Sequence, residues 1–268
     1  MATLKRGSQG PEVKRLQKAL LEQGFDCGGA DGDFGGGTEA ALMAFKRSEG
    51  LLADGIAGPR TLVALGLAKK QDAWPNLIPG VTVQAVSHMF PHTPIGNIEA
   101  NLPPVCDALA GRELTDKPMV LMALATIRAE TEGFEPVAEG RSRFNTSPSG
   151  HPFDLYDHRR DLGNQGPPDG ERFRGRGYIQ LTGRDNYARY GKAIGLGNQL
   201  VNEPELASDP KVAGQLLAAF LKDKELRIKE ALLEGDLRTA RRLVNGGSHG
   251  LDRFEDAFRR GQEVLSDS

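Results

Sequence analysis

The hydrophobic positions near the start of the chain repeat with a helical period. In VKRLQKALLEQGF (13–25) apolar side chains recur every three or four residues, and Pro11 stands where a helix can begin. The same spacing returns over TEAALMAFKRSEG (38–50) and, in a shorter form, over GPRTLVALGL (58–67). We therefore predict a small domain of three helices.

From residue 81 to the end the pattern is again mostly helical. One helix is expected after Pro103–Pro104, another opens the stretch 118–140, and a run of helices fills the chain from 184 onward. Residues 141–177 interrupt this pattern, because they are rich in Gly, Pro, Asn and Asp. A loop of this length is usually functional or disordered, and its aromatic residues argue against disorder. The predicted fold class is mainly α.

The stretch 118–140 places a carboxyl group at the end of a buried helix. Met119, Ala123, Ile127 and Glu130 share one helical face at 3.6 residues per turn. A carboxyl group that ends an apolar stripe is costly to ionise, which suits a general acid near neutral pH. Glu139 follows in a wetter, Gly-flanked loop, and two carboxyl groups in contrasting settings are typical of glycosidases. The structural alternative is a helix-end acid that pairs with an arginine.

Charge, cysteines and histidines argue against several other classes of function. The 268 residues carry a formal net charge of −2, so nothing attracts the chain to nucleic acid or to an anionic membrane. Cys27 and Cys106 are interpreted as packing residues. His88 and His92 have helical spacing, but Pro91 breaks the helix that would align them on a metal. We expect a monomer without cofactor, metal, nucleic-acid partner or stable membrane insertion.

The segment ERFRGRGYIQLTGRDNY (171–187) carries short polar side chains beside aromatic ones. Gln180, Thr182 and Asn186 lie close to Tyr178, and such uncharged donors and acceptors suit sugar hydroxyl and acetamido groups. Residues 178–182 are predicted as a short buried strand or a strained turn, and on an extended segment 180 and 182 would point to one face. The rival interpretation is phosphate binding by the arginines of this segment.

The first part of the chain contains an internal repeat, ADGDFGGGTEAALMAF (30–45) against ADGIAGPRTLVAL (53–65). Together with LKRGSQGPEVKRLQKALLEQGF, these segments resemble the type 1 peptidoglycan-binding module, a three-helix domain that binds the cell wall. The resemblance covers residues 3–67 and implies that this part anchors the protein to peptidoglycan. The loop at Asp31 and Asp33 is not predicted to bind calcium, because Leu42 stands where a bidentate acid is needed.

The rest of the chain resembles glycoside hydrolase family 19, and within it the phage endolysin branch. The motifs that carry this resemblance lie between Phe90 and Leu265 and read ATIRAETEGFEPVAEGRSRFN, YDHRRDLGN, RFRGRGYIQLTGRDNY, NEPELASDP and LVNGG. The resemblance implies a lysozyme-like, two-lobed α-helical domain that cleaves β-1,4 bonds next to N-acetylated sugars with inversion. It implies Glu130 as the general acid and Glu139 as the general base.

The same resemblance implies which residues contact the sugar. The positions that match are Gln180, Thr182, Asn186, Asn245 and Arg253. The chain departs from the plant enzymes, which have His where this chain has Ala129 and whose two acids stand further apart. The short spacing is that of the endolysins. Glu132 and Glu135 are interpreted as solvated acids outside the site.

We therefore predict a modular enzyme of the endolysin type, with a peptidoglycan-binding domain (1–67), a linker (68–80) and a catalytic domain (81–268). It is expected to hydrolyse peptidoglycan for bacterial cell lysis, with carboxyl groups about 6.5–9.5 Å apart as inversion requires. The N-terminus lacks the apolar region of a secretory signal, so we expect synthesis in the host cytoplasm and holin-type release toward the periplasmic peptidoglycan. The alternatives are a chitinase and a non-catalytic cell-wall-binding protein.

Overall fold

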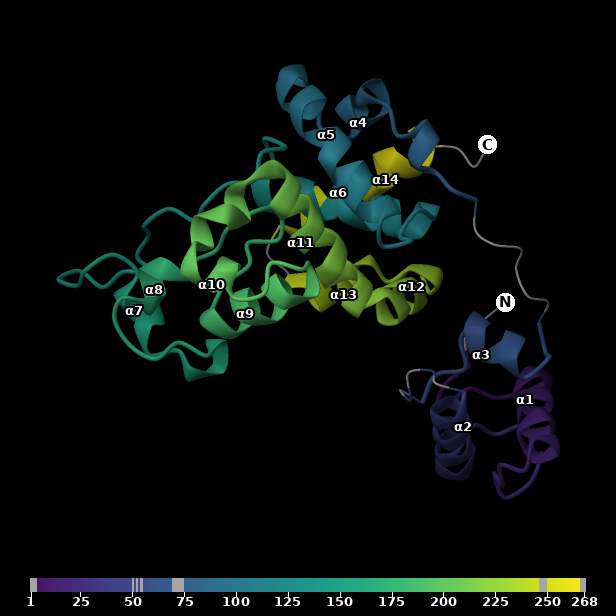
Figure 1. The fold of residues 1–268 in the computed structure, drawn as a ribbon. Coiled ribbons are helices and arrows are strands. Elements are labelled where there is room, and N and C mark those ends of the chain that lie inside the picture. Colours follow the sequence, from purple (N-terminus) through teal and green to yellow (C-terminus); the bar gives the residue numbers. More distant parts are fainter. Residues whose placement is uncertain are drawn as a thin grey trace. The chain divides into compact units, whose positions relative to one another are not determined.

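The computed structural model of the protein describes residues 4–49, 51, 53, 55–68, 75–245 and 250–265. Within these ranges helices are joined by loops, and strand pairing is limited to isolated bridges (Figure 1). Contacts group the chain into two compact units, residues 1–73 with 229–236 and residues 74–228 with 237–268. The predicted mainly α fold class is confirmed. Residues 69–74 of the predicted linker lie outside the described ranges, and the domain boundaries stay a prediction.

The first unit contains three helices at the positions that the hydrophobic period predicts. These are α1 (Pro11–Glu22), α2 (Gly36–Ser48) and α3 (Pro59–Ala64). Their apolar faces meet in one core, in which Leu16 of α1 and Phe45 of α2 are buried. Proline at the first position of α1 and α3 starts both helices without losing a hydrogen bond, because the first N–H groups of a helix have no partner inside it.

Gln17 fixes the acidic loop that joins α1 to α2. Its buried amide nitrogen donates to Asp31 Oδ1 at 2.8 Å and to Thr38 Oγ1 at 2.9 Å, and its oxygen accepts from Gly32 N at 2.8 Å. Hydrogen bonds from Asp33 N and from Gln17 lower the pKa of Asp31. The loop is therefore organised by the protein's own donors, which favour its ionised carboxylate.

From residue 75 onward the described chain forms these elements in order: η1 (Ile78–Gly80), α4 (Val83–Met89), α5 (Ile95–Ala110), α6 (Lys117–Thr131), α7 (Asp154–Asp157), η2 (Arg160–Leu162), α8 (Asp169–Arg172), α9 (Arg184–Ala193), α10 (Gln199–Asn202), η3 (Pro204–Ser208), α11 (Pro210–Asp223), α12 (Glu225–Leu233), α13 (Leu237–Asn245) and α14 (Leu251–Val264). The η elements are short 3₁₀ turns. Within the described residues, no helix is both long and apolar enough to span a lipid bilayer.

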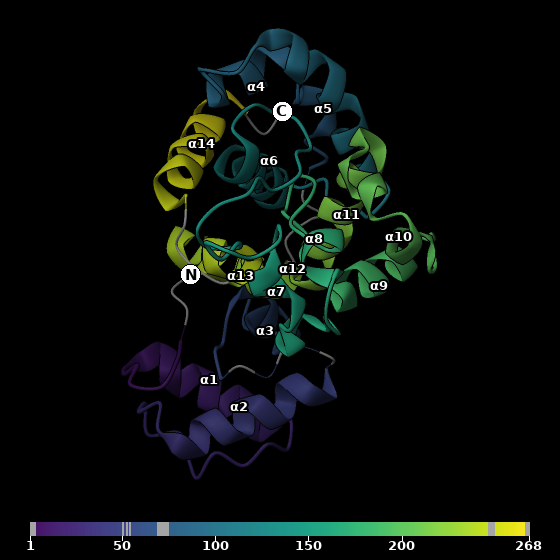
Figure 2. The same cartoon turned by 90° about the vertical axis from the view of Figure 1, so that its left-hand side faces the viewer.

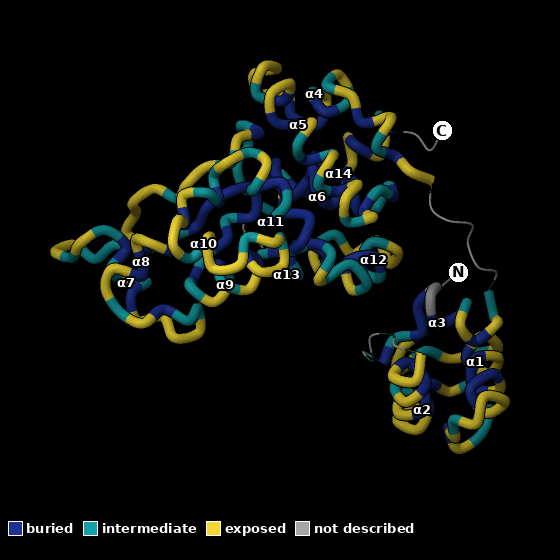
Figure 3. Tube along the Cα trace, viewed as in Figure 1, coloured by how far each residue is buried: buried dark blue, intermediate teal, exposed yellow. Residues whose placement is uncertain are grey.

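Helix α6 lies at the centre of the second unit. It packs against α4, α11, α13 and α14, and these helices surround it in Figure 2. Every residue from Met119 to Ala129 is buried, as the dark trace of α6 in Figure 3 shows. Asp116 caps its start by accepting a hydrogen bond from Met119 N at 3.2 Å. This helix carries Glu130 out of the core at its last turn.

Helix α5 begins earlier than predicted. The sequence places a helix after Pro103–Pro104, but α5 starts at Ile95 and continues through both prolines. Each proline removes one intrahelical hydrogen bond. The carbonyl groups that lose a partner belong to the exposed residues Glu99 and Ala100, where water can replace it. Burial of the apolar side chains before the prolines stabilises this first half of the helix, so the predicted start is wrong.

Buried polar side chains organise the long loop 141–177. Four of them accept hydrogen bonds from main-chain N–H groups: Asn145 from Ser142, Asp157 from Gly170, Asn164 from Arg184 and Asp169 from Gln165. These side chains take the place of helix and strand partners for a backbone that has little regular structure. The loop is ordered, as its aromatic content predicts.

Candidate active site

Glu130 lies at the end of α6 and is paired with a buried arginine. Arg241 of α13 is 0% exposed, and its guanidinium lies 2.8 Å from Glu130 Oε1. The Glu130 side chain itself is 11% exposed, so it stands at the edge of the core. This contact links α6 to α13 through a largely buried ion pair. The structural alternative from the sequence, a helix-end acid paired with an arginine, therefore describes this geometry.

The start of α14 approaches the end of α6 closely. Gly250 has a φ of +68°, and a Cβ atom there would lie 2.9 Å from the carbonyl oxygen of Ala129. Any larger residue would be strained and would press on the backbone next to Glu130. Helix α13, which ends at Asn245, thus reaches this acid through Arg241, and the start of α14 lies beside the end of α6. Residues 246–249 between them are outside the described ranges.

Glu139 is held by three hydrogen-bond donors from different parts of the chain. Asn145 Nδ2 and the Tyr156 hydroxyl each donate to its Oε1 at 3.0 Å, and Gly175 N donates to Oε2 at 3.2 Å. Its own N–H donates to Gly175 O at 2.7 Å, next to a bridge between Ala138 and Arg176. These donors fix the orientation of the carboxylate, as a positioned general base requires.

Gly175 brings Glu139 together with two of the predicted sugar-binding residues. A Cβ atom on Gly175 would lie 2.8 Å from Gln180 Oε1 and 3.3 Å from both Glu139 Oε2 and Thr182 Oγ1. The three side chains therefore converge on the space that the missing side chain leaves. Thr182 Oγ1 donates to Gln180 O at 2.8 Å, and Asn186 Nδ2 donates to Thr182 O at 2.7 Å. Asn186 thus supports the backbone of this group.

Residues 178–182 form a turn, the second of the two predicted conformations. Gln180 has a φ of +48°, and Arg176 and Leu181 pair across the turn. The amide nitrogen of Gln180 donates to the carbonyl groups of Val137 at 3.0 Å and Gly177 at 3.1 Å. These hydrogen bonds hold a non-glycine residue in the left-handed region, which is a strained conformation found at functional sites.

Tyr178 does not lie on the surface of the site. Its side chain is 0% exposed, its ring packs near Phe134, and its hydroxyl donates to Asn101 Oδ1 at 3.3 Å. A ring in this position packs in the core, so the predicted contact of Tyr178 with sugar is not supported by its place in the fold. The amphipathic character of tyrosine suits either setting.

Arg253 pairs with Glu132 instead of with a predicted catalytic acid. Its guanidinium lies 3.1 Å from Glu132 Oε2, and Glu132 also stands 4.0 Å from Arg128. The Glu132 side chain is 45% exposed, as expected for a solvated acid, and its pair with Arg253 also links the end of α6 to α14. Glu135 is exposed.

The N-terminal unit has a recognisable family. Residues 9–65 match the peptidoglycan binding domain family. N-acetylmuramoyl-L-alanine amidase CwlL of Bacillus licheniformis is 42% identical over 73 residues, 25% of this chain and 20% of that protein.

An acidic 26 kDa endochitinase of Solanum lycopersicum is 52% identical over 44 residues, 16% of this chain and 17% of that protein. This chain spans about a fifth of the length of each of these curated relatives.

Solved structures resemble the chain over a larger share of its length. Chitinase C from Streptomyces griseus is 20% identical, with a TM-score of 0.49 over 69% of this chain and 92% of that one. A mutant of chitinase C gives 19% identity and a TM-score of 0.50, over 70% and 94%. A Burkholderia phage endolysin is 20% identical, with a TM-score of 0.29 over 98% and 100%. The likeness to the chitinase C mutant shows a shared fold.

Three residues of the site are not among those predicted from the sequence. Asn145 and Tyr156 lie in motifs that indicate the family, but no local pattern shows that they bind Glu139. Arg241 does leave a signal, because it stands four residues after Leu237 and three before Val244, on the apolar stripe of α13. A charged residue on such a stripe predicts a buried ion pair.

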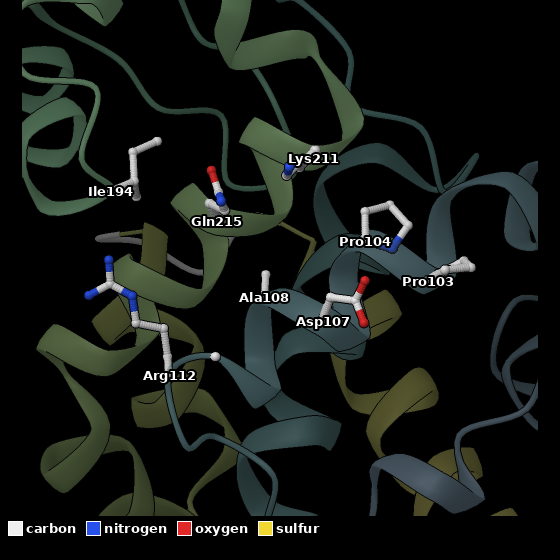
Figure 4. Close-up of a pocket in the computed structure, with 9 residues that line it drawn as sticks. Pro103, Pro104, Asp107, Ala108, Arg112, Ile194, Lys211 and Gln215 are labelled. Atoms are coloured by element: carbon white, nitrogen blue, oxygen red, sulfur yellow. The ribbon is translucent and has the colours of Figure 1, made fainter.

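The candidate acids lie apart from the cavity shown in Figure 4. Asp107 of α5, Arg112 just after α5, and Lys211 and Gln215 of α11 line this cavity, which has a volume of about 430 Å³. None of its lining residues is a predicted site residue.

In the described part of the chain no three His, Cys, Asp or Glu side chains gather in a way that could hold a metal ion. Cys27 of the peptidoglycan-binding domain is a buried free thiol.

Proposed function

We propose that the protein hydrolyses β-1,4 glycosidic bonds of peptidoglycan, with Glu130 as general acid and Glu139 as general base. The observation that supports this most is the setting of Glu139. Its carboxylate is fixed by three donors, and the side chains of Gln180 and Thr182 converge beside its Oε2. A fixed carboxylate beside neutral hydrogen-bonding side chains is suited to activating a water molecule next to a sugar.

In the proposed reaction Glu139 Oε2 takes a proton from the attacking water. Oε2 has one main-chain donor, whereas Oε1 already accepts two side-chain hydrogen bonds. Thr182 Oγ1 donates to Gln180 O, so its lone pairs can accept a hydrogen bond from the same water. The water oxygen bonds to the anomeric carbon as the bond to the leaving oxygen breaks, which inverts the configuration.

Glu130 delivers the proton that the leaving oxygen needs. Arg241 contacts Oε1 of Glu130, so the proton for the leaving oxygen would be carried on Oε2. Glu139 gains one proton and Glu130 loses one in each turnover, so exchange with solvent resets the site. The distance between the two carboxyl groups stays a prediction, about 6.5–9.5 Å for an inverting enzyme.

Peptidoglycan is the substrate that the family match favours. The peptidoglycan binding domain at residues 9–65 would hold the enzyme on the wall, which raises the local concentration of cleavable bonds. The local identity to a muramoyl-alanine amidase points to the same polymer. Chitin is the second candidate, because the fold resembles chitinase C and a short segment is 52% identical to an endochitinase.

The test is to incubate the purified full-length chain with peptidoglycan and, separately, with chitin. New reducing ends in peptidoglycan are expected, and mass spectrometry of these ends identifies the sugar that carries them. Reducing ends from chitin alone would assign the second candidate. Release of free N-terminal alanine without reducing ends would show an amidase, and binding without any bond cleavage would show a wall-binding protein.

We further propose that the protein acts as a monomer in bacterial cell lysis. It would be made in the cytoplasm of the host and reach the periplasmic peptidoglycan after holin-type release. Expression in a bacterium with and without a holin tests this route, since lysis is expected only when both are present. Light scattering of the purified chain tests the monomer.

A further inference from the structure

A tight turn follows Glu139, and the residue that closes it also binds Glu139. The Oδ1 atom of buried Asn145 accepts from Ser142 N at 2.9 Å, and its Nδ2 donates to Gly140 O at 2.9 Å and to Glu139 Oε1 at 3.0 Å. One side chain thus fixes the turn and the carboxylate together. Whatever the tip of this turn presents lies next to the proposed general base.

The tip of the turn presents two arginines and a phenylalanine to solvent. Arg141, Arg143 and Phe144 are exposed, and Phe144 is 74% exposed. The guanidinium of Arg143 lies 4.9 Å from the centre of the Phe144 ring. Stacking of this kind leaves the in-plane N–H groups of the guanidinium available to a carboxylate.

The charge of this turn is not neutralised by neighbouring acids. Among the residues that the structure describes, neither Arg141 nor Arg143 forms an ion pair. Elsewhere in this part of the chain Arg159 pairs with Asp161 and Arg184 with Asp169, and Arg172 and Arg174 donate to main-chain carbonyl groups. Two exposed arginines without an ion pair, on the turn that follows the proposed general base, indicate a surface that receives an anionic ligand.

We propose that Arg141, Arg143 and Phe144 bind the peptide-substituted sugar of peptidoglycan, the arginines its carboxylates and the ring its sugar face. This rests on the proposed function and names the part of the substrate that the enzyme selects. Peptidoglycan strands carry lactyl groups and short peptides with free carboxylates, whereas chitin is uncharged. A guanidinium matches a carboxylate with two parallel hydrogen bonds, and an exposed aromatic ring suits the apolar face of a sugar.

The experiment uses the full-length chain and soluble peptidoglycan strands in two forms. One form keeps its stem peptides, and the other has lost them to an amidase, so that only the lactyl carboxylate remains. In the double variant Arg141→Gln/Arg143→Gln, kcat/KM on peptide-bearing strands is expected to fall about 5- to 30-fold at low salt. A loss of this size corresponds to two exposed ion pairs with the substrate. The loss should shrink at high salt, because salt screens exposed charges.

Matched variants separate charge from structure. Arg227→Gln/Arg259→Gln removes two exposed arginines elsewhere and should leave kcat/KM unchanged. Arg141→Lys/Arg143→Lys keeps the charge and should retain most of the rate on peptide-bearing strands. Phe144→Ala is expected to lower kcat/KM about 3- to 10-fold on both substrates at every salt concentration.

The outcomes distinguish this inference from the proposed function. A loss confined to peptide-bearing strands assigns the stem peptide as the partner, and an equal loss on both forms assigns the lactyl carboxylate. If the Arg141→Gln/Arg143→Gln variant matches the Arg227→Gln/Arg259→Gln control within twofold at low salt, the inference is wrong while the function stands. If the unmodified chain releases no reducing ends from either form, the proposed function fails and this inference with it.

Discussion

Arg241 places its guanidinium 2.8 Å from Oε1 of Glu130 and is itself wholly buried. The proposed general acid therefore also compensates a charge inside the fold. Arg241 packs over the ring of Phe254, 6.0 Å from its centre, so that α6, α13 and α14 meet around this pair. A buried charge that loses its partner is strongly destabilising. Stability and catalysis are thus coupled at Glu130.

Removal of the arginine is expected to weaken the fold. Arg241→Met should lower the free energy of unfolding by about 3 kcal/mol, the lower end for a broken buried pair, because Glu130 retains some access to water. The double variant Glu130→Gln/Arg241→Met should recover part of this loss. Urea unfolding of the four members of this cycle measures the coupling. Strictly additive effects would show that the pair does not contribute to stability.

Removal of the proposed acid is expected to abolish cleavage but not wall binding. Glu130→Gln keeps an oxygen that can accept from Arg241, so the protein should stay folded, while the rate of reducing-end release falls at least about 100-fold. Exposed Glu135 supplies the control, and Glu135→Gln should cleave normally. Sedimentation with purified cell walls measures binding. Near-full activity in Glu130→Gln would remove Glu130 from the mechanism.

Loss of one donor to the proposed base should change the dependence of the rate on pH. Burial and the adjacent Glu139 carboxylate raise the pKa of Tyr156 to about 12, so its hydroxyl donates throughout any practical assay. A donor to a carboxylate favours its ionised form. In Tyr156→Phe the acidic limb of the pH–rate profile should therefore move to higher pH, with a loss in kcat of about 3- to 10-fold.

Tyr190→Phe is the matched control for that experiment. The Tyr190 hydroxyl donates to Asp223 at 3.2 Å, far along the chain from both proposed acids. Tyr190→Phe also removes a tyrosine hydroxyl group, but one that does not contact Glu139. It should therefore leave the acidic limb of the pH–rate profile in place. A limb that stays fixed in Tyr156→Phe as well would show that the Tyr156 hydroxyl has no influence on the group that titrates.

The loop 141–177 should lose stability in acid through Asp169. Burial alone would raise the pKa of Asp169, but hydrogen bonds from Arg184 and from Gln165 N outweigh burial and lower it. A carboxyl group with a lowered pKa stabilises the fold above its ordinary value of about 3.9, and this contribution is lost as the pH falls through the lowered value.

Asp169→Asn is accordingly expected to be less stable than the unmodified chain by about 2 kcal/mol at pH 7, with a difference that narrows below about pH 4. Unfolding free energies measured from pH 7 to pH 3 test this. Asp107→Asn, at an exposed position, is the control and should change the free energy of unfolding little. If the difference in unfolding free energy between Asp169→Asn and the unmodified chain stays constant from pH 7 to pH 3, the Asp169 carboxylate is not the group that makes stability depend on pH.

Local pattern predicts the helices and the position of Glu130, because both depend on neighbours within two turns. Capping by Asp116 and Asp209 is visible in the sequence for the same reason. The helical period marks Arg241 as buried, but it cannot show that its partner is Glu130, which stands 111 positions earlier in the chain. Tyr178 shows the same limit, since a hydroxyl partner 77 positions away decides that its ring lies in the core.

The alternation of polar and apolar residues around Gln180 suggests a strand where the backbone forms a turn. Polar and apolar residues alternate over 178–182 as they do in a strand, yet the backbone turns, with Gln180 at a φ of +48°. Hydrogen bonds to Val137 and Gly177 determine that conformation. These contacts are tertiary, so propensity and spacing could indicate only the two alternatives. The convergence of Gln180 and Thr182 on Gly175 follows from the turn, which the strand alternative would not have produced.

The three donors to Glu139 have a consequence for recombination and protein engineering. They come from the turn at Asn145, from α7 at Tyr156 and from the backbone at Gly175. In addition, the side-chain amide of Gln180 donates to the carbonyl group of Val137. A graft that moves fewer than residues 137–182 would separate the carboxylate from part of its setting. This segment should therefore pass between related enzymes only as one inseparable cassette.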